Sequence, residues 1–549
     1  MNRPIVLISP PSSGRSAKRS LQPTENVRLG YAAACLRTGE RPVVMLDADI
    51  ERASGEEIEA HLRTLQPAGL VIQLLYRNIA AGLMLAHMAK QLPIQPWVAV
   101  FEYAATLSGP PLMDQDSNID AVILGWPELA LLAIAKKPDV PALWTDISGL
   151  LLRESSVGAW RATDHRTSSL ELDTIPFPAR DYLPRSLRSF HVADIISSRG
   201  CYGRCTFCNI PTLHAYEAGA AWRARSAQNV VNEIASLVGD YGVTRFNFID
   251  ENFIGPRKAG QQRARELARL LRENGLQIQY GIYCRADDIT PDLFSELRAS
   301  GLRLVRFGIE SGVPRLLQRY KKGLTLDQMI EALVTLRELA IDAEPSFIMF
   351  EPSMSLVELE QNLRFVLTHG LLGLVNPTCV IPFNGTELTA ALRNEGCIAS
   401  SDYLVPGFLP DVTFTDARVG RVRVLWNDWR TRLDYEYEGL SHLLEEMLQI
   451  EVFSRAAEDS IFWNAIMADF SELKRVEAEF VLGLIQCLAK KSRLQDETHS
   501  LRRAGRVLQR FRMRLGAHRH LLPPHCSLRR EPLCEQPGAC APSLSLSMC

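Results

Sequence analysis

Short apolar runs alternate with amphipathic segments over roughly the first 140 residues, a pattern that predicts a parallel sheet with helices on its faces. The predicted strands are Ile5–Ser9, Pro42–Asp47, Gly69–Leu75, Trp97–Phe101 and Ile119–Leu124, and Val27–Thr38 is a predicted helix. Five such strands form a doubly wound, Rossmann-like sheet, in which ligands bind beyond the carboxyl ends of the strands. Pro10 and Pro11 follow the first strand, so we expect them at such a site.

A second series of strand and helix patterns runs from Asp194 to about Leu392. Its predicted strands are Asp194–Ser198, Arg245–Asp250, Gln277–Cys284, Leu304–Gly308, Glu344–Phe350 and Val375–Ile381. Six strand and helix units predict a partial (β/α)6 barrel of the TIM type, whose functional groups lie at the C-terminal ends of the strands.

Together these patterns predict an α/β protein with several domains, because 549 residues are too many for one ordinary core. We expect the Rossmann-like domain at residues 1–140, a proline-rich linker at 141–191, the barrel at 192–393 and a helical C-terminal domain at 394–520. The composition of residues 521–549, rich in Pro, Ser and Leu, predicts a disordered tail.

Composition narrows the classes of function. A hydrophobic content of 46%, a charged content of 23% and a net charge of -2 are typical of a soluble globular protein and favour neither a nucleic-acid nor a membrane partner. The twelve cysteines are scattered and no secretory signal is visible, which predicts reduced thiols in the cytoplasm. The basic segment Lys490–Arg530 either docks an acidic peptide or nucleic acid, or is a solvated tail.

The most informative stretch is Ser197–Pro211, SSRGCYGRCTFCNIP. Cys201, Cys205 and Cys208 stand at spacing C-x3-C-x2-C, and Phe207 is placed to shield a bound group from water. Three thiolates on one short loop suit an iron-sulfur cluster, and a cubane with three cysteine ligands leaves one iron open. Zinc fits less well, because structural zinc sites usually take two separated pairs of ligands and no second pair follows at that spacing.

This motif, including the aromatic residue before its last cysteine, resembles the signature of the radical S-adenosylmethionine (SAM) superfamily. The resemblance implies that Cys201, Cys205 and Cys208 hold a [4Fe-4S] cluster whose open iron binds SAM. Reductive cleavage of SAM then yields a 5′-deoxyadenosyl radical, so an electron donor such as flavodoxin or ferredoxin is expected. The cofactors supply the chemistry. The protein binds and orients them and excludes water from the site.

The same resemblance suggests which residues bind SAM. The candidates are Asp250, Glu251, Asn252, Arg285, Glu310 and Ser311. The first three lie in FIDENF, which corresponds to the family's G-G-E region, with an acidic helix cap as the alternative. Arg285 ends a predicted strand and either pairs with the methionine carboxylate or forms a surface ion pair with Asp287 or Asp288. Glu310 and Ser311 lie beside two glycines, which allow close approach to the ribose hydroxyls. No residue is indicated as acting on the substrate.

Segments of the N-terminal part resemble the cobalamin-binding domain found in one branch of this superfamily. The matching segments are LISPP at Leu7–Pro11, RLGYAAACL at Arg28–Leu36, VVMLDAD at Val43–Asp49 and DAVILGWPE at Asp120–Glu128. The linker segment Leu172–Leu183, LDTIPFPARDYL, resembles the bridge that precedes the cluster domain in this branch.

Two departures from that branch concern cobalamin. The loop Ser12–Asn26 contains no histidine that could be a lower axial ligand of cobalt, and Phe101, Glu102 and Tyr103 replace a glycine pair. The domain therefore either binds cobalamin without a histidine ligand or is a scaffold that has lost it. Arg28 lies near the expected face and would either sit below the corrin or at the surface.

The resemblance implies C-methylation of an unactivated carbon in a small-molecule or peptide substrate, such as a natural product, a ribosomal peptide or a tetrapyrrole. Cyclisation, rearrangement or oxidation by radical chemistry is the first alternative, and a non-catalytic binding protein that keeps a cluster is the second. A methylthiotransferase fits less well, because only Cys35 precedes Cys201 and a second N-terminal cluster needs three cysteines.

Overall fold

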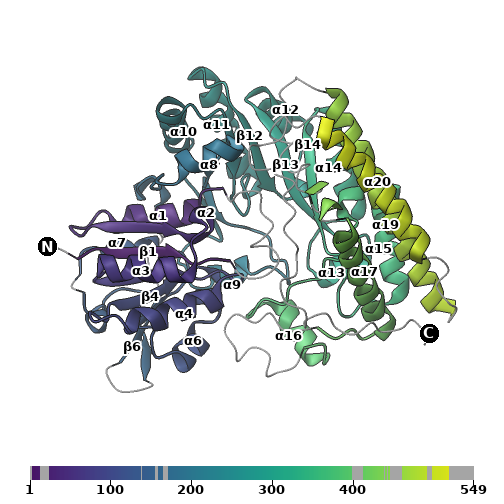
Figure 1. Cartoon of the computed structure of the whole chain (residues 1–549). Coiled ribbons are helices and arrows are strands. Elements are labelled where there is room, and N and C mark those ends of the chain that lie inside the picture. The colour runs from purple at the N-terminus through teal and green to yellow at the C-terminus, as the bar shows by residue number, and fades with distance from the viewer. Residues whose placement is uncertain are drawn as a thin grey trace. The chain divides into compact units, whose positions relative to one another are not determined.

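A computed structural model describes the protein at residues 3–12, 24–137, 139–154, 159–164, 171–398, 412–437, 439–441, 443–444, 460–490 and 497–517 (Figure 1). The chain divides into two compact units. The first unit is Met1–Phe307, Tyr320–Glu344 and Ile381–Asp411, and the second is Gly308–Arg319, Pro345–Val380 and Val412–Cys549.

The first unit begins with a seven-stranded sheet in the order β2-β1-β3-β4-β5-β6-β7. Its five parallel strands are β1 (Ile5–Ser9), β2 (Val43–Asp47), β3 (Gly69–Gln73), β4 (Trp97–Phe101) and β5 (Ala121–Ile123). These confirm the doubly wound α/β pattern. Two antiparallel strands, β6 (Leu150–Arg153) and β7 (Trp160–Ala162), extend the sheet within the segment that the sequence predicted to be a linker.

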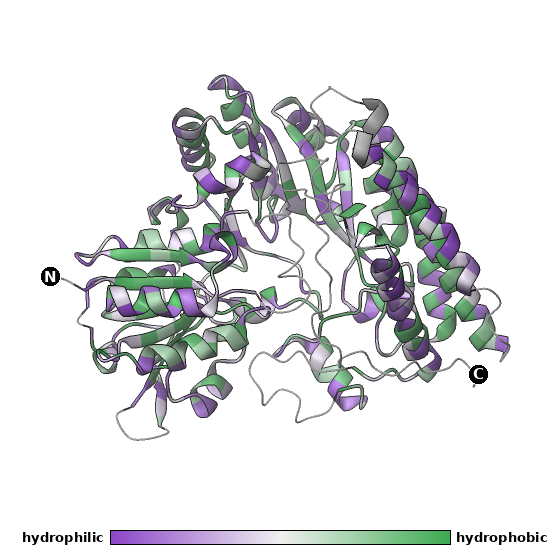
Figure 2. Cartoon of the chain, in the orientation of Figure 1, coloured by the Kyte–Doolittle hydropathy of each residue, from purple (hydrophilic) through white to green (hydrophobic). Residues whose placement is uncertain are grey.

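Helices cover both faces of this sheet (Figure 1). The helices of this region are α1 (Val27–Leu36), α2 (Ala48–Glu51), α3 (Gly55–Leu65), α4 (Ile79–Lys90), α5 (Tyr103–Leu107), α6 (Gly109–Gln115) and α7 (Glu128–Ile134). Ile5 and Leu7 of β1 pack in a core with α1 and α7, whereas Val6 and Ile8 pack in a core with α3, α4 and α6. Because β1, β3, β4 and β5 are buried on both faces, these strands are mainly apolar, as Figure 2 shows.

A second sheet has five strands in the order β14-β13-β12-β11-β8. Its strands are β8 (Ala193–Ile195), β11 (Arg245–Phe248), β12 (Gln279–Cys284), β13 (Leu302–Glu310) and β14 (Asp342–Phe347). The sixth predicted strand is present only as a parallel bridge between Phe350 and Cys379. A short antiparallel pair, β9 (Ser198–Gly200) and β10 (Trp222–Ala224), precedes and follows the three cysteines.

Helices follow the strands of this sheet as the alternating pattern predicted. They are α8 (Leu183–Phe190), α9 (Ile210–His214), α10 (Ala227–Tyr241), α11 (Arg257–Glu273), α12 (Pro291–Ala299), α13 (Pro314–Arg319), α14 (Leu326–Glu338), α15 (Leu356–Thr368) and α16 (Glu387–Asn394). Single turns of 3-10 helix occur at Pro141–Leu143, Leu172–Thr174, Ala286–Asp288 and Leu372–Leu374.

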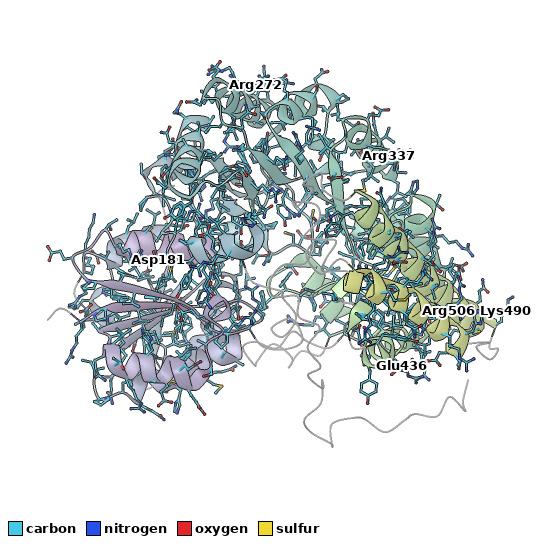
Figure 3. All side chains as sticks on the ribbon, turned by 45° about the horizontal axis from the view of Figure 1, so that its top comes forward. Asp181, Arg272, Arg337, Glu436, Lys490 and Arg506 are labelled. Carbon is cyan, nitrogen blue, oxygen red and sulfur yellow. The ribbon has the colours of Figure 1, made fainter. Side chains whose placement is uncertain are left out.

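The C-terminal part is helical, as predicted, with α17 (Ala417–Glu436), α19 (Ser460–Lys490) and α20 (Glu497–Ala517). The basic helix α20 packs against α19, where Arg503 pairs with Glu479 and Arg514 pairs with Asp469. Arg506 of α20 is exposed (Figure 3). Part of the basic face is thus neutralised within the chain. The remainder of the basic segment and the predicted disordered tail, 521–549, lie outside the described residues.

In the described part of the chain, no helix has both the length and the apolar composition needed to cross a lipid bilayer.

Candidate cluster and cofactor site

The three cysteines lie in a loop, here called the cluster loop (Cys201–Cys208), that follows strand β9 directly. The backbone N–H of Thr206 donates to the carbonyl of Tyr320 at 3.0 Å, and the carbonyl of Thr206 accepts from Leu388 N–H at 2.9 Å. Within the loop, Cys208 N–H donates to the Cys205 carbonyl at 3.1 Å. The loop is therefore held by backbone bonds to two distant segments, while all three cysteines remain partly exposed.

The cysteines fit a cluster better than a single ion. Among the described residues, no three His, Cys, Asp or Glu side chains converge closely enough to hold one metal ion. A cubane does not require such convergence, because each thiolate binds a different iron. Burial raises the pKa of the Cys201 thiol, and coordination to iron would supply the positive charge that keeps it deprotonated. None of the three cysteines forms a disulfide, and soft thiolate donors suit iron-sulfur chemistry.

Aromatic and charged side chains surround the cluster loop. The Phe207 ring meets the Tyr320 ring edge to face, with centroids 5.2 Å apart. Arg285, directly after β12, lies close enough to Gly203 that a Cβ there would be 3.0 Å from a guanidinium nitrogen. The structure thus brings the predicted Phe207 and Arg285 together at the loop.

Arg285 also has partners within its own segment. Its Nε donates to Asp287 Oδ1 at 2.9 Å and its Nη2 donates to the Lys322 carbonyl at 3.0 Å. The pair with Asp287 was the alternative role for Arg285, but the arginine side chain is only 11% exposed, so this is no surface pair. Burial opposes the charge of Arg285, but Asp287 raises its pKa above the usual value.

Asp250 and Asn252 hold the backbone around the cluster loop. The Asp250 carboxylate is buried and accepts from Ser197 N–H at 2.8 Å and Ser198 Oγ at 2.7 Å. Burial raises its pKa, although these hydrogen bonds oppose the rise. Asn252 Oδ1 accepts from Gly255 N–H at 2.6 Å, and Asn252 Nδ2 donates to Asp288 at 3.1 Å. Both side chains therefore have protein partners beside the loop.

Glu251, between them, points to the N-terminal sheet. Its Oε1 accepts from Arg28 Nη2 at 2.6 Å and from the Tyr103 hydroxyl at 2.9 Å, and its Oε2 accepts from Gly200 N–H at 3.1 Å. Burial disfavours ionisation, but Arg28 and Arg199 outweigh it and lower the pKa of Glu251 below its usual value. The Arg28 side chain is accordingly only partly exposed, and no sequence pattern indicated Glu251 as its partner.

Glu310 and Ser311 belong to the second unit. Glu310 ends β13 in a left-handed conformation, with φ of 68°, and accepts from Ser346 Oγ at 3.3 Å. Ser311 Oγ donates to Asn362 Oδ1 at 2.9 Å. The nearby Glu351, fully buried, pairs with Arg319 at 3.0 Å. Neither residue of this last pair was among the predicted site residues.

The carboxyl edge of the N-terminal sheet carries a polar network. Pro10 follows β1 directly, and its carbonyl accepts from Asn78 Nδ2 at 3.3 Å, while Pro11 comes next and is partly buried. Asn26 Nδ2 donates to Gln73 Oε1 at 2.6 Å, and Gln73 Nε2 donates to Glu102 at 3.2 Å. These amides lie at the edge where a doubly wound sheet binds its ligand.

The backbone of Glu102 has a conformation that is usual only for glycine. Its φ is 88° and its ψ is -174°, a region that costs a residue with a side chain about 1–3 kcal/mol. The position is where a glycine pair is expected from the resemblance, so the backbone shape is kept while a buried carboxylate fills the space next to Arg28.

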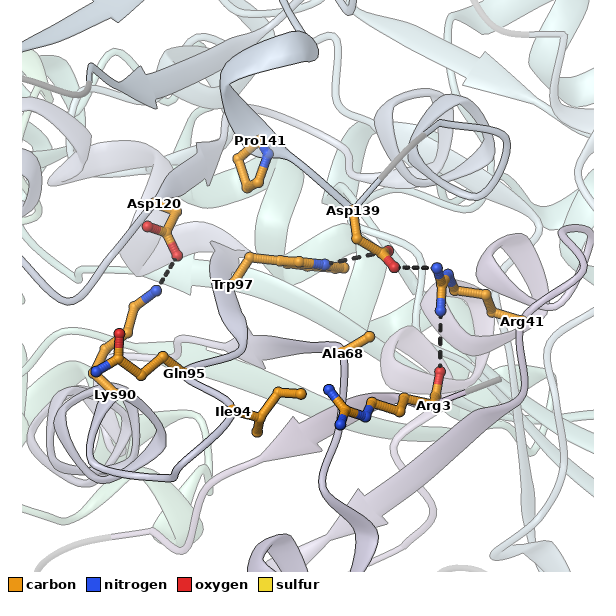
Figure 4. Close-up of a pocket in the computed structure, with 10 residues that line it drawn as sticks. All are labelled: Arg3, Arg41, Ala68, Lys90, Ile94, Gln95, Trp97, Asp120, Asp139 and Pro141. Carbon is orange, nitrogen blue, oxygen red and sulfur yellow. Dashed lines mark hydrogen bonds and ion pairs between the residues drawn. The ribbon is translucent and has the colours of Figure 1, made fainter. Parts of the chain in front are cut away.

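A separate pocket of about 570 Å³ lies at the opposite, amino-terminal edge of the same sheet (Figure 4). Ala68, Trp97 and Asp120 line it at the starts of strands. Two of its cations are already paired, Lys90 with Asp120 and Arg41 with Asp139. The pocket is thus distinct from the predicted cofactor edge.

Gly200, directly before Cys201, provides a local test of the cluster loop. Its φ is 82°, and an alanine Cβ would overlap the Ala221 carbonyl oxygen. We expect Gly200→Ala to destabilise the first unit by at least about 1–3 kcal/mol and to lower the iron bound after reconstitution. Gly242→Ala is the matched control, because Gly242 also has a positive φ but its Cβ would meet nothing. Equal iron content in both variants would contradict the prediction.

Comparison with known proteins identifies the central part. Residues 195–366 match the profile of the radical SAM superfamily. The chain carries a radical SAM domain. This domain implies a [4Fe-4S] cluster and SAM, and a radical SAM enzyme acts on a substrate and needs a reductant.

This chain has sequence relatives that are named methyltransferases. It is 26% identical over 70% of its length to an uncharacterized methyltransferase of Pyrococcus horikoshii, covering 82% of that protein. It is 30% identical over 44% of its length to cytidylyl-2-hydroxyethylphosphonate methyltransferase of Streptomyces wedmorensis, covering 49% of that protein. An anaerobic magnesium-protoporphyrin IX monomethyl ester cyclase of Cereibacter sphaeroides is 24% identical over 66% of the chain and 59% of its own length.

The fold resembles that of a cobalamin-dependent radical SAM enzyme. The structure of OxsB with aqua-cobalamin and SAM bound superposes with a TM-score of 0.66 over 94% of this chain and 84% of that chain, at 17% identity. The chain therefore carries a radical SAM domain, its fold is similar to that of OxsB, and its sequence is more similar to the two methyltransferases than to the cyclase.

Proposed function

We propose that this enzyme methylates an unactivated carbon of its substrate, using a [4Fe-4S] cluster, SAM and cobalamin. Residues 1–140 would bind cobalamin and residues 192–393 would bind the cluster and SAM. When bound, the cluster and SAM would supply a radical able to remove a hydrogen atom, and cobalamin would carry the methyl group, while the chain's residues bind and orient these groups and exclude water. Two cofactors that act on one substrate carbon must lie near each other, because catalysis depends on proximity and orientation.

One observation supports this proposal above the others. Glu251 contacts Gly200, directly before the cluster loop, and also Arg28 and Tyr103, at the carboxyl edge of the N-terminal sheet. Both regions belong to the first unit. The predicted cobalamin edge is thus joined through one side chain to the predicted cluster site, as a shared reaction space requires.

The chain's residues have these proposed roles. Cys201, Cys205 and Cys208 hold the cluster, and Phe207 limits the access of water. Asp250, Glu251, Asn252 and Arg285 fix the methionine part of SAM, and Glu310 and Ser311 bind its ribose. Arg285 suits its role because its guanidinium lies against Gly203 of the cluster loop and carries a stable positive charge.

We propose that cobalamin binds at Pro10, Pro11 and the side-chain amides of Asn26 and Gln73. The side-chain amides of Asn26 and Gln73 can both donate and accept hydrogen bonds, which suits a ligand that carries many amide groups at its edge. With no histidine in the Ser12–Asn26 loop, cobalt would lack an imidazole from this loop. We further propose a cytoplasmic enzyme that receives electrons from a flavodoxin or ferredoxin and acts on a natural product, a peptide or a tetrapyrrole.

The proposal is tested by anaerobic reconstitution with iron, sulfide and hydroxocobalamin, followed by desalting and measurement of cobalt, iron and the visible spectrum. We expect about one cobalt per chain and a spectrum without histidine ligation. With a reductant and SAM, the loaded enzyme should release S-adenosylhomocysteine as the cobalt becomes methylated. Iron without cobalt would refute methyl transfer through cobalamin and make the N-terminal sheet a scaffold.

A further inference from the structure

Two ion pairs, one half-buried and one buried, join the N-terminal sheet region to the residues that lead into the cluster loop. Arg28 of α1 pairs with Glu251 at 2.6 Å, and their side chains are 16% and 9% exposed. Arg199 of β9 pairs with Glu128, the first residue of α7, and these side chains are 4% and 2% exposed. Arg28 and Glu251 are 223 positions apart, so this contact exists only because the sheet and the cluster region fold together.

Both pairs act on strand β9, which is continuous with the cluster loop. The Arg199 side chain belongs to this strand, and the backbone N–H of Gly200, the strand's last residue, donates to Glu251 at 3.1 Å. Tyr103 adds a third contact from the sheet side, because its hydroxyl donates to Glu251 at 2.9 Å. The residue before Cys201 is thus held by a carboxylate whose other partners come from the sheet region.

Trp126 links the two ion pairs. The guanidinium of Arg28 lies 4.9 Å from the centre of the Trp126 ring, and that of Arg199 lies 4.7 Å from it. The Tyr103 ring packs edge to face on Trp126 at 5.8 Å. Cation–π contacts are strongest when the guanidinium is shielded from water, so these contacts also fix the orientation of the two arginine side chains.

Stability alone does not account for this arrangement. Burying an ion costs several kcal/mol, and replacement of a buried pair by apolar side chains of similar volume is often neutral or stabilising. A further carboxylate, Glu102, is buried 3.8 Å from Arg28 in a strained backbone conformation. What a hydrogen-bonded buried pair provides, and an apolar contact does not, is one defined geometry.

We propose that Arg28, Tyr103, Trp126, Glu128, Arg199 and Glu251 form a sheet-to-loop clamp that positions the cluster loop. Arg28, Tyr103, Trp126 and Glu128 are then positioning residues for the cluster, although all four belong to the N-terminal part of the chain. The clamp acts through strand β9 and needs neither cobalamin nor substrate. It therefore goes beyond the proposed methyl transfer and can be right or wrong independently of it.

The test uses the full chain reconstituted with iron and sulfide only. Arg28→Met removes the cation that pairs with Glu251. Glu251→Gln removes the negative charge of Glu251 itself. We expect each variant to lose iron to a chelator about tenfold faster than the unchanged protein, as the loss of one charged hydrogen bond allows. The electron paramagnetic resonance signal of the reduced cluster should shift in both. Arg28→Lys should restore part of the slow release.

The double variant Arg28→Met with Glu251→Gln separates positioning from stability. Glu251 then carries no unpaired charge, and the loss of Arg28 beside Glu102 is common to both variants. The free energy of unfolding of the double variant should therefore recover relative to Arg28→Met. Its iron release should nevertheless stay fast, because the link to the sheet is still missing. Arg37→Met is the control, since Arg37 also lies next to α1 but pairs with Asp181 at the surface.

Two results would overturn the clamp. One is iron release that recovers together with stability in the double variant, which would make the pair a folding device only. The other is an unchanged release rate and resonance signal in Arg28→Met. If Arg28→Met does not fold, Tyr103→Phe takes its place, because it removes only the hydroxyl that donates to Glu251. Tyr103→Phe should shift the same resonance signal. An unchanged signal in this variant would also refute the proposal. No cobalt enters these measurements, so they do not depend on the outcome for methyl transfer.

Discussion

Cys205→Ala is expected to abolish cluster binding and with it the cleavage of SAM. Cys205 is the middle one of the three proposed ligands in the cluster loop. A cluster with two protein thiolates is not retained during desalting. Iron and sulfide should fall to background after anaerobic reconstitution, and the reduced protein should form no 5′-deoxyadenosine from SAM.

The matched control is Cys487→Ala, a partly buried cysteine of helix α19 outside the cluster loop. It should bind iron and cleave SAM as the unchanged protein does. Cys205→Ala should still bind hydroxocobalamin if the N-terminal sheet holds it, because the cobalamin edge uses other residues. Retention of the cluster and of SAM cleavage in Cys205→Ala would contradict the assignment of the three ligands and remove the basis of the radical mechanism.

The cluster loop could be predicted from sequence because its chemistry is local. Three cysteines within eight residues define both the donor atoms and the number of irons that they can bind. Glu251 illustrates the opposite case. The FIDENF segment indicated a polar site, but the residue's main partner, Arg28, is 223 positions away, and no periodicity or motif connects them.

The parallel sheet was predictable for a different reason. Strands such as Val6–Ile8 are buried on both faces, so each is a continuous apolar run that stands out from the amphipathic helices. The antiparallel strands β6 and β7 were missed because nearby prolines made the segment look like a linker. The run Val375–Ile381 predicted a full strand, but Pro377 lacks an N–H donor and Pro382 ends the segment, and only the bridge at Cys379 forms.

Pairing of charges was the least predictable property. Arg285 was expected either at SAM or in a surface pair, and the structure shows a buried pair with Asp287 beside Gly203. The basic helix α20 suggested a docking face, yet Arg503 and Arg514 pair with residues of α19. In both cases the sequence supplies the charge, and only the packing of distant elements decides its partner.

Arg180, in the bridge segment between the two sheets, joins three parts of the first unit. Its guanidinium pairs with Glu25, before α1, and with Glu233 of α10 at 2.7 Å, and it donates to the Asp194 carbonyl of β8 at 3.0 Å. The Arg180, Glu25 and Glu233 side chains are at most 7% exposed. Burial raises the pKa of Glu25 to about 7, although Arg180 opposes the rise.

Arg180→Ala should therefore lower the free energy of unfolding by about 3–5 kcal/mol near pH 8, the usual cost of leaving a buried charge without its partner. Glu233 keeps Arg225 as a partner, so Glu25 is the group left unpaired. In the variant the pKa of Glu25 should rise further. A raised carboxyl pKa in the folded state makes stability fall as pH increases. Between pH 5 and pH 8 the difference from the unchanged protein should therefore grow mainly above about pH 7, the pKa of Glu25 in the unchanged protein.

Urea unfolding across this pH range measures the effect, and two variants make it specific. Arg180→Ala combined with Glu25→Gln should regain stability at pH 8 and lose most of the added pH dependence, because no charge is then left unpaired. Arg63→Ala, which removes an exposed pair with Glu59, should change little at any pH. A loss in Arg180→Ala that is the same at pH 5 and pH 8 would mean that lost packing, and not the buried charge of Glu25, sets the cost.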